Sequence, residues 1–267
     1  MSVITNNFAN AELMAKEAET IPAFNGLNLY YIKEKVTEIL QHIGKDGIFS
    51  EYTLHDISHI NTMLESLDWI IPNNTQKIMT ATDWLLIVLS IYFHDMGMLV
   101  TRDEFEKRNQ SEFANFKTTM EKNENYNELN SKLKLFSEEK RDKYLYQEFV
   151  RKNHATRIRL WIEGNINIEF GVSEQIVNEI RELLRPLGEE FRQDLATVCE
   201  SHHLDDLIDF DKYPISKPYA NNKDSTANVQ YAAIILRTAD LLHVTQNRTP
   251  SVSSFGPISG FAPNWLI

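Results

Sequence analysis

The chain has 267 residues, of which 42% are hydrophobic, so it can bury one sizeable core in a single large domain or in two small ones. Its formal net charge of -11 argues against a surface that coats nucleic acid, although a bound metal ion would supply local positive charge for a small phosphorylated substrate. The single cysteine, Cys199, excludes a disulfide framework and a zinc site of several thiolates, and it favours a reducing cytoplasm.

Targeting and membrane signals are absent from the sequence pattern. Residues 1–7 lack the cationic start and apolar run of a secretory signal. The most apolar stretch, residues 84–93, is too short to span a bilayer. We therefore expect a cytoplasmic protein with no membrane association, in which residues 84–93 form a buried helix.

Apolar residues recur at helical spacing along most of the chain, whereas strand-like alternation is scarce. After an N-terminal arm over residues 1–28, we expect helices over residues 29–43, 56–70, 83–95, 141–163, 173–185, 189–203 and 227–245. Pro186 and Gly188 separate two of them. The pattern predicts an all-α domain over residues 29–250.

Three segments differ from this core pattern. Residues 101–143 are rich in Glu, Lys, Asn and Arg, which is typical of a polar helical insertion or cap. Residues 210–227 contain two prolines and an Asn-Asn-Lys-Asp-Ser run, which predicts a long loop that shapes access to a site. Residues 251–267 have no helical pattern, and we expect an irregular tail that is either a docking segment or the remnant of a longer protein.

Histidines and aspartates interrupt the apolar segments in a definite order. They are His59, the adjacent pair His94 and Asp95, His154, the adjacent pair His202 and His203, and Asp240. Isolated imidazoles and carboxylates are costly in apolar surroundings unless they are paired or bound to metal, so the series suggests one shared site. A mixed set of imidazole nitrogens and carboxylate oxygens suits Mn(II), Fe(II), Zn(II) or a related divalent ion better than calcium.

The adjacent pair requires a particular backbone. Neighbours on a helix point about 100° apart, so His94 and Asp95 converge on one ion most easily near a helix end, and Gly97 is a suitable end marker. Asp240 interrupts the apolar run 234–242, where a bound metal would offset the cost of burying a carboxylate.

The order His59, His94-Asp95 and Asp240 resembles that of the HD superfamily of metal-dependent phosphohydrolases. The local sequences also match: His-Ile-Asn-Thr-Met-Leu at the first histidine, Ile-Tyr-Phe-His-Asp-Met-Gly at the pair and Leu-Arg-Thr-Ala-Asp-Leu-Leu at the last aspartate. The resemblance runs from about residue 29 to about residue 250. It implies a helical bundle with the metal ligands on its inner helices.

The resemblance also implies a ligand assignment. A first ion would be held by His59, His94, Asp95 and Asp240, and a second by His154 and His202, with Asp95 bridging the two. The ions would be Mn, Fe, Zn or Ni, with Mg as an alternative, and Asp95 with His94 would carry the catalysis. His203 and His55 are additional candidates for the site. Arg157, one turn after His154, and Arg237, one turn before Asp240, are candidates for binding phosphate.

The sequence departs from several branches of this superfamily. It lacks the Gly-Tyr-Pro element of cyclic-di-GMP phosphodiesterases and the Glu-Asp pair that follows the doublet in alarmone hydrolases. The segments Arg-Lys-Asn-His-Ala-Thr-Arg and Arg-Thr-Ala-Asp-Leu-Leu-His more closely resemble HD modules that precede a GHKL-type ATPase in larger bacterial proteins. An ATPase or another protein is therefore an expected partner.

Three functions are consistent with these features. The first is a metal-dependent phosphohydrolase that acts on a nucleotide or a nucleotide-derived signal. The second is an HD-type nuclease for single strands, which would need a basic groove that the acidic composition disfavours. The third is a sensory or partner-binding module without turnover. The sequence leaves the substrate, the metal and the oligomeric state open.

Overall fold

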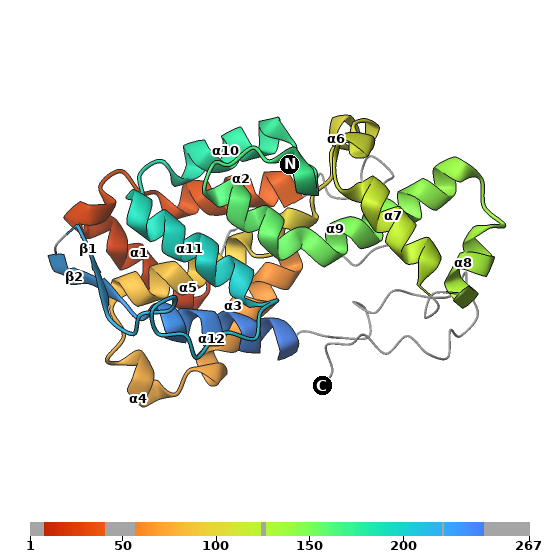
Figure 1. Ribbon diagram of the computed structural model, residues 1–267. Coiled ribbons are helices and arrows are strands. Elements are labelled where there is room, and N and C mark those ends of the chain that lie inside the picture. Colours follow the sequence, from red (N-terminus) through yellow and green to blue (C-terminus); the bar gives the residue numbers. More distant parts are fainter. Residues whose placement is uncertain (1–7, 41–56, 124–126, 221, 243–267) are drawn as a thin grey trace, which may run out of the picture.

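The computed structural model describes residues 8–40, 57–123, 127–220 and 222–242, and these form a helical bundle with a small two-stranded sheet (Figure 1). The all-α class predicted from the sequence is confirmed. In chain order the elements are α1 (Asn10–Lys16), η1 (Glu17–Thr20), η2 (Pro22–Phe24), α2 (Leu29–Leu40), α3 (Ile57–Ile70), α4 (Asn73–Gln76), α5 (Ala81–Phe93), η3 (Met96–Met98), α6 (Arg102–Glu106), η4 (Arg108–Gln110), α7 (Phe113–Lys122), α8 (Asn127–Leu133), α9 (Glu138–Ile162), η6 (Ile168–Phe170), α10 (Glu174–Leu184), α11 (Glu189–Ser201), β1 (Lys217–Tyr219), β2 (Asn222–Ala227) and α12 (Val229–Leu242).

Each helix that the periodicity predicts has a counterpart, with ends that differ by a few residues. Residues 41–43, 56 and 243–245, at the ends of three predicted helices, lie outside the described residues. The expected loop over residues 210–227 is only partly irregular, because β1 and β2 pair as an antiparallel hairpin within it. Backbone pairing across a short turn needs no apolar alternation, so the periodicity does not reveal such a hairpin.

Helix α5 is the centre of the bundle. All of its residues from Thr82 to Phe93 are buried, and α1, α3, α11 and α12 pack around it (Figure 1). A helix that is apolar on every side is stable only when it is covered on every side, which explains this central position. Within the described ranges, no helix has the length and apolar character needed to cross a membrane.

Part of the predicted N-terminal arm belongs to the main core. Ala11 and Ala15 of α1 are buried against α5, where their small side chains allow the two helices to approach closely. Glu12, also buried, accepts a hydrogen bond from the hydroxyl of Tyr92 on α5 and forms an ion pair of 2.8 Å with Lys33 on α2. The division of the chain into an arm, a domain and a tail stays a prediction.

The segment of residues 101–143, called the cap segment below, has a hydrophobic cluster of its own. The cluster comprises Met98, Phe105, Phe113, Met120, Leu129, Leu133, Leu145, Tyr146, Phe149 and Val150. The 25-residue helix α9 joins this cluster to the main core, because Tyr146 and Phe149 lie in the former and Ile158 and Trp161 in the latter (Figure 1). Helix α9 is therefore packed in both clusters.

Asp83 holds the starts of two helices together. Its carboxylate accepts the backbone N–H of Thr80, the N-cap of α5, at 2.8 Å, and the N–H of Asn228 at 2.7 Å. Asn228 in turn accepts the N–H of Tyr231 at 2.8 Å and so caps α12. Because one carboxylate accepts hydrogen bonds at the starts of both helices, it fixes the start of α12 relative to that of α5.

We predict that Asp83→Ala lowers the free energy of unfolding by about 2 kcal/mol, because it leaves two backbone N–H groups at helix starts without their acceptor. Ser137→Ala is the matched control, since Ser137 accepts one N–H, that of Lys140 at 3.3 Å, and caps α9 alone. Urea unfolding of both variants measures the difference. Equal losses in the two variants would contradict the shared cap.

Candidate metal centre

The predicted ligands come together from five helices. His59 lies on α3, His154 on α9 and Asp240 on α12, whereas the pair His94 and Asp95 follows the end of α5 and the pair His202 and His203 follows the end of α11. They form two adjoining groups. Of the additional candidates, His203 joins the second group, and His55 lies outside the described residues.

The first group consists of His59, His94, Asp95 and Asp240, and one potential ligand atom of each lies within 4.8 Å of the others. Nε2 of His94 is 3.2 Å from Oδ2 of Asp95 and 3.9 Å from Oδ1 of Asp240. Nε2 of His59 is 3.8 Å from the same two oxygens. Ligand atoms that bind one ion at about 2.0–2.2 Å lie roughly 3–3.5 Å apart, so these atoms are close to the spacing of a coordination shell.

The backbone after α5 makes this convergence possible. The helix ends at Phe93, and Asp95 has φ -94° and ψ -1° before the chain turns into η3. The predicted helix end at the doublet is therefore confirmed. Gly97 lies within this turn, where a Cβ would overlap the backbone oxygen of His154. Only a glycine allows the turn to lie directly against α9.

The second group consists of His154, His202 and His203. Nε2 of His154 lies 2.9 Å from Nε2 of His202, and the ring of His203 stands edge-on to that of His154, with 4.4 Å between the centroids. His154 is buried, whereas His203 is exposed. The group is thus closed on the side of the core and open on the side of His203.

Asp95 lies between the two groups. Its Oδ2 faces His94 at 3.2 Å, and its Oδ1 lies 3.6 Å from Nε2 of His154. The two oxygens of one carboxylate therefore point towards different sets of imidazoles. This is the arrangement that a bridging ligand requires.

Hydrogen bonds to the backbone set the tautomers of three rings. Nδ1 of His94 donates to the carbonyl of Ile91 at 2.9 Å, Nδ1 of His154 donates to the carbonyl of Arg151 at 2.7 Å, and Nδ1 of His202 donates to the carbonyl of Cys199. A carbonyl only accepts, so each Nδ1 carries the proton and each neutral ring presents the lone pair of Nε2. Metal-binding histidines are oriented in this way in proteins.

These tautomers provide a test of whether the residues fit a metal. The facing Nε2 atoms of His154 and His202 both present lone pairs, which repel at 2.9 Å unless a cation lies with them. Nε2 of His94 is buried and, in the described part of the chain, has no hydrogen bond of acceptable geometry. Nitrogen and carboxylate donors around buried lone pairs fit a divalent transition metal.

The electrostatics of the two groups differ. Burial favours the neutral ring of His94, but the charges of Asp95 and Asp240 outweigh it and raise its pKa to about 10. Burial, together with repulsion from His94, lowers the pKa of His202 to about 4, and burial with repulsion from His202 lowers the pKa of His154. The first group therefore attracts a cation strongly: without a metal this cation is the proton on Nε2 of His94, which a metal ion would displace. The second group holds neutral imidazoles that are ready to bind a cation.

The phosphate-binding role predicted for Arg157 is wrong. Its side chain is completely buried, and all of its N–H groups are used by the carboxylate of Glu104 and by backbone carbonyls, among them those of Gly97 and Leu99. A helical wheel places Arg157 beside His154 but cannot show that its side chain points to the far side of the η3 turn. Glu104 was not a sequence candidate, since nothing distinguishes it from its acidic neighbours.

Arg237 has a different environment. It donates to the carbonyl of Leu204 at 2.6 Å and to Oδ1 of Asp205 at 3.0 Å, and about a third of its side chain is exposed. It therefore links α12 to the turn that follows His203 while remaining at the surface.

Comparisons with known proteins give one match. The family model HD-CE matches residues 49–258, well over half of the chain, and this range includes every member of both groups. No curated protein matches the chain, and no solved structure does.

We predict that Gly97→Ala destabilises the protein by at least about 2 kcal/mol, because the added methyl group forces the η3 turn away from α9. Gly188→Ala is the matched control, since no atom lies within 4 Å of its added Cβ and its φ of -60° suits alanine. Thermal unfolding monitored by circular dichroism compares the two. A Gly97→Ala variant as stable as the Gly188→Ala variant would refute the close packing.

Proposed function

The chain belongs to the HD-CE family, and from that premise we propose that it is a metal-dependent phosphohydrolase that cleaves a phosphoester or phosphoanhydride bond of a nucleotide or a nucleotide-derived signal. The observation that carries the proposal is the position of Asp95, whose two oxygens face two groups of imidazoles. A single ligand shared by two groups is typical of sites that hold a pair of metal ions.

The two groups divide the ligands between two divalent ions. His59, His94, Asp95 and Asp240 would hold the first, and His154 and His202, with His203 beside them, would hold the second together with Asp95. When bound, such ions lower the pKa of water strongly, towards neutrality, and neutralise phosphate charge. The donor set suits Mn, Fe, Zn or Ni, with Mg as an alternative.

The protein's own groups would position the reactants. Asp95 is fixed at the helix end, so its carboxylate would orient an attacking water as well as help to hold the ions. The Nδ1 hydrogen bonds hold the rings of His94, His154 and His202 in place, so little reorganisation is required during the reaction.

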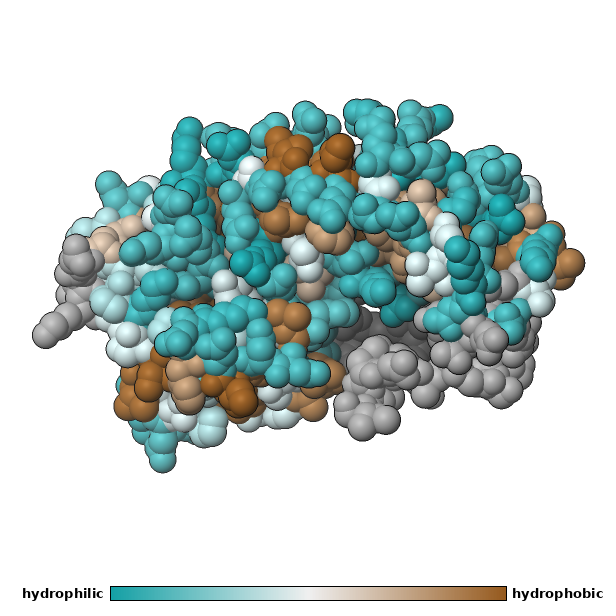
Figure 2. Space-filling view, viewed as in Figure 1, coloured by the Kyte–Doolittle hydropathy of each residue, from teal (hydrophilic) through white to brown (hydrophobic). Residues whose placement is uncertain are grey.

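The substrate would approach from the side of Asp240 and His203. The side chain of Asp240 is 25% exposed and His203 is exposed, whereas the side chains of His59 and His94 are only 4% and 1% exposed. Figure 2 shows mainly hydrophilic residues on the visible face of the described chain. Arg237, next to the turn after His203, would then bind phosphate oxygens from the open side.

The overall charge favours a small substrate over a nucleic acid. With a formal charge of -11, the chain would repel a long phosphate backbone, while a few local cations suffice for a nucleotide. The resemblance to modules that precede GHKL-type ATPases supports a cytoplasmic setting beside such a partner.

We expect Mn(II) to raise the thermal unfolding temperature of the metal-free protein. An ion that binds only the folded state stabilises it by about 2.7 kcal/mol when its concentration is a hundred times its Kd. Asp95→Asn should abolish most of this shift, since it weakens both groups at once. Asp103→Asn, on the exposed surface of α6, is the control and should shift like the wild type. An equal shift in all three proteins would exclude the proposed centre.

We expect the Mn(II)-loaded protein to release phosphate or a nucleoside phosphate from at least one member of a panel of nucleotides and cyclic dinucleotides, and kcat of Asp95→Asn to be at least about a thousandfold lower. Chromatography of the products, with Asp103→Asn as control, is the measurement. Cleavage of single-stranded DNA or RNA alone would replace the proposal with a nuclease. Stoichiometric metal without turnover on any substrate would favour a sensory module.

A further inference from the structure

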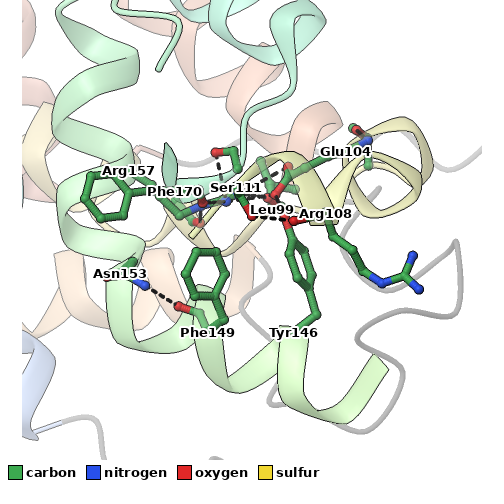
Figure 3. Close-up of polar contacts among 12 residues, drawn as sticks. Leu99, Glu104, Arg108, Ser111, Tyr146, Phe149, Asn153, Arg157 and Phe170 are labelled. Atoms are coloured by element: carbon green, nitrogen blue, oxygen red, sulfur yellow. Dashed lines mark hydrogen bonds and ion pairs between the residues drawn. The ribbon is translucent and has the colours of Figure 1, made fainter. Parts of the chain in front are cut away.

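Arg157 joins the metal centre to the rest of the molecule. It lies on α9, three residues after His154, and its Nε donates to the carbonyl of Gly97 at 2.7 Å, while Nη2 donates to the carbonyl of Leu99 at 2.8 Å (Figure 3). Gly97 and Leu99 are the second and fourth residues after Asp95. One guanidinium therefore ties the turn that follows Asp95 to the helix that carries His154.

Glu104 holds this guanidinium from the cap segment. It lies on α6, is 3% exposed and binds Arg157 through both oxygens, with Oε1 2.8 Å from Nη1 and Oε2 3.2 Å from Nη2. The hydroxyl of Tyr146 on α9 also donates to Oε1 at 2.8 Å (Figure 3). A bidentate pair fixes distance and angle together, so α6 and the η3 turn cannot shift independently.

Backbone from a distant loop closes the network. The carbonyls of Phe170 and Gly171 accept from Nη1 of Arg157 at 2.6 and 3.0 Å. Gly171 has φ +78°, and a Cβ there would lie only 2.6 Å from Oε1 of Glu104. The residue is therefore restricted to glycine by its backbone and by the space around the ion pair.

We propose that Arg157 is a positioning residue for the metal centre, and that Glu104 makes the cap segment part of the same device. Through the carbonyls of Gly97 and Leu99, Arg157 keeps Asp95 oriented so that one oxygen faces His94 and the other faces His154. The inference rests on the proposed function for the existence of the metal centre. A substrate that moves α6 would change the orientation of Asp95 through this pair.

The physical basis is the specificity of the guanidinium fork. A buried cation that has lost water must be surrounded by acceptors, and here those acceptors come from η3, α6 and the loop at residues 170–171. An ammonium in the same place keeps the charge but cannot reach three segments in a planar array. Arg157→Lys therefore separates the positioning effect from the charge.

The experiment uses the full chain with Arg157→Lys and, as a second variant that leaves the arginine intact, Glu104→Gln. Arg159→Lys is the matched control, because Arg159 lies on the same helix and binds Glu163 and Glu200 instead, at 3.1 and 2.6 Å. A cavity variant in α10, Val177→Ala, controls for loss of stability alone. Each protein is first shown to be folded at the assay temperature by circular dichroism.

Two measurements are made on metal-free protein. The first is hydrogen exchange of the Met98 amide, which donates to the carbonyl of Asp95 at 2.9 Å and so reports on the turn. The second is titration with Co(II), monitored by the visible absorption of the bound ion, which depends on ligand geometry. In Arg157→Lys we expect faster exchange, an altered spectrum and a Co(II) Kd on the order of tenfold or more higher. Glu104→Gln should show the same changes to a smaller extent.

Wild-type affinity and spectrum in folded Arg157→Lys and Glu104→Gln would overturn the inference. An equal loss of Co(II) affinity in Val177→Ala, at the same loss of thermal stability as in Arg157→Lys, would also overturn it, because instability alone would then account for the effect. A wild-type chain that binds Co(II) but hydrolyses none of the panel would refute the phosphohydrolase while leaving this comparison valid.

Discussion

Buried carboxylates and imidazole lone pairs within a few ångströms of one another impose the main constraint on this fold. Asp95 lies 3.2 Å from His94 and 3.6 Å from His154, and the facing nitrogens of His154 and His202 are 2.9 Å apart. Such a set is favourable only when a cation lies among its members. The helices that carry these residues must therefore be positioned accurately relative to one another, although each helix is stabilised mainly by apolar packing away from the site.

Several features of the bundle fix the relative positions of these helices. The apolar helix α5 is buried over its length and ends where the doublet must turn. Asp83 ties the start of α5 to that of α12, and Gly97 allows the following turn to touch α9. On the outer side of the same turn, hydrogen-bond acceptors, among them the carbonyls of Gly97 and Leu99, surround the buried guanidinium of Arg157 in place of water. The supporting contacts are thus backbone carbonyls and helix caps, which leave few degrees of freedom to side chains.

The cap segment gives the site a second level of organisation. Its hydrophobic cluster, which contains Phe113, also includes Tyr146 from the first half of α9, and the second half of the same helix carries His154. Glu104 then connects the cap to the ligand turn directly. The cap segment and the two groups of candidate ligands are therefore connected through a single helix, α9.

The sequence by itself determined the helices, the helix end at the doublet and the series of candidate ligands, because apolar periodicity is local and because charged groups in apolar segments are conspicuous. It could not place Arg157, whose side chain points to the far side of a turn, and it gave no reason to single out Glu104 among many acidic residues. Nor did it reveal the hairpin of β1 and β2. Only the tertiary structure decided which arginine is enclosed and which, like Arg237, stays at the surface, because that depends on contacts between segments more than 30 residues apart.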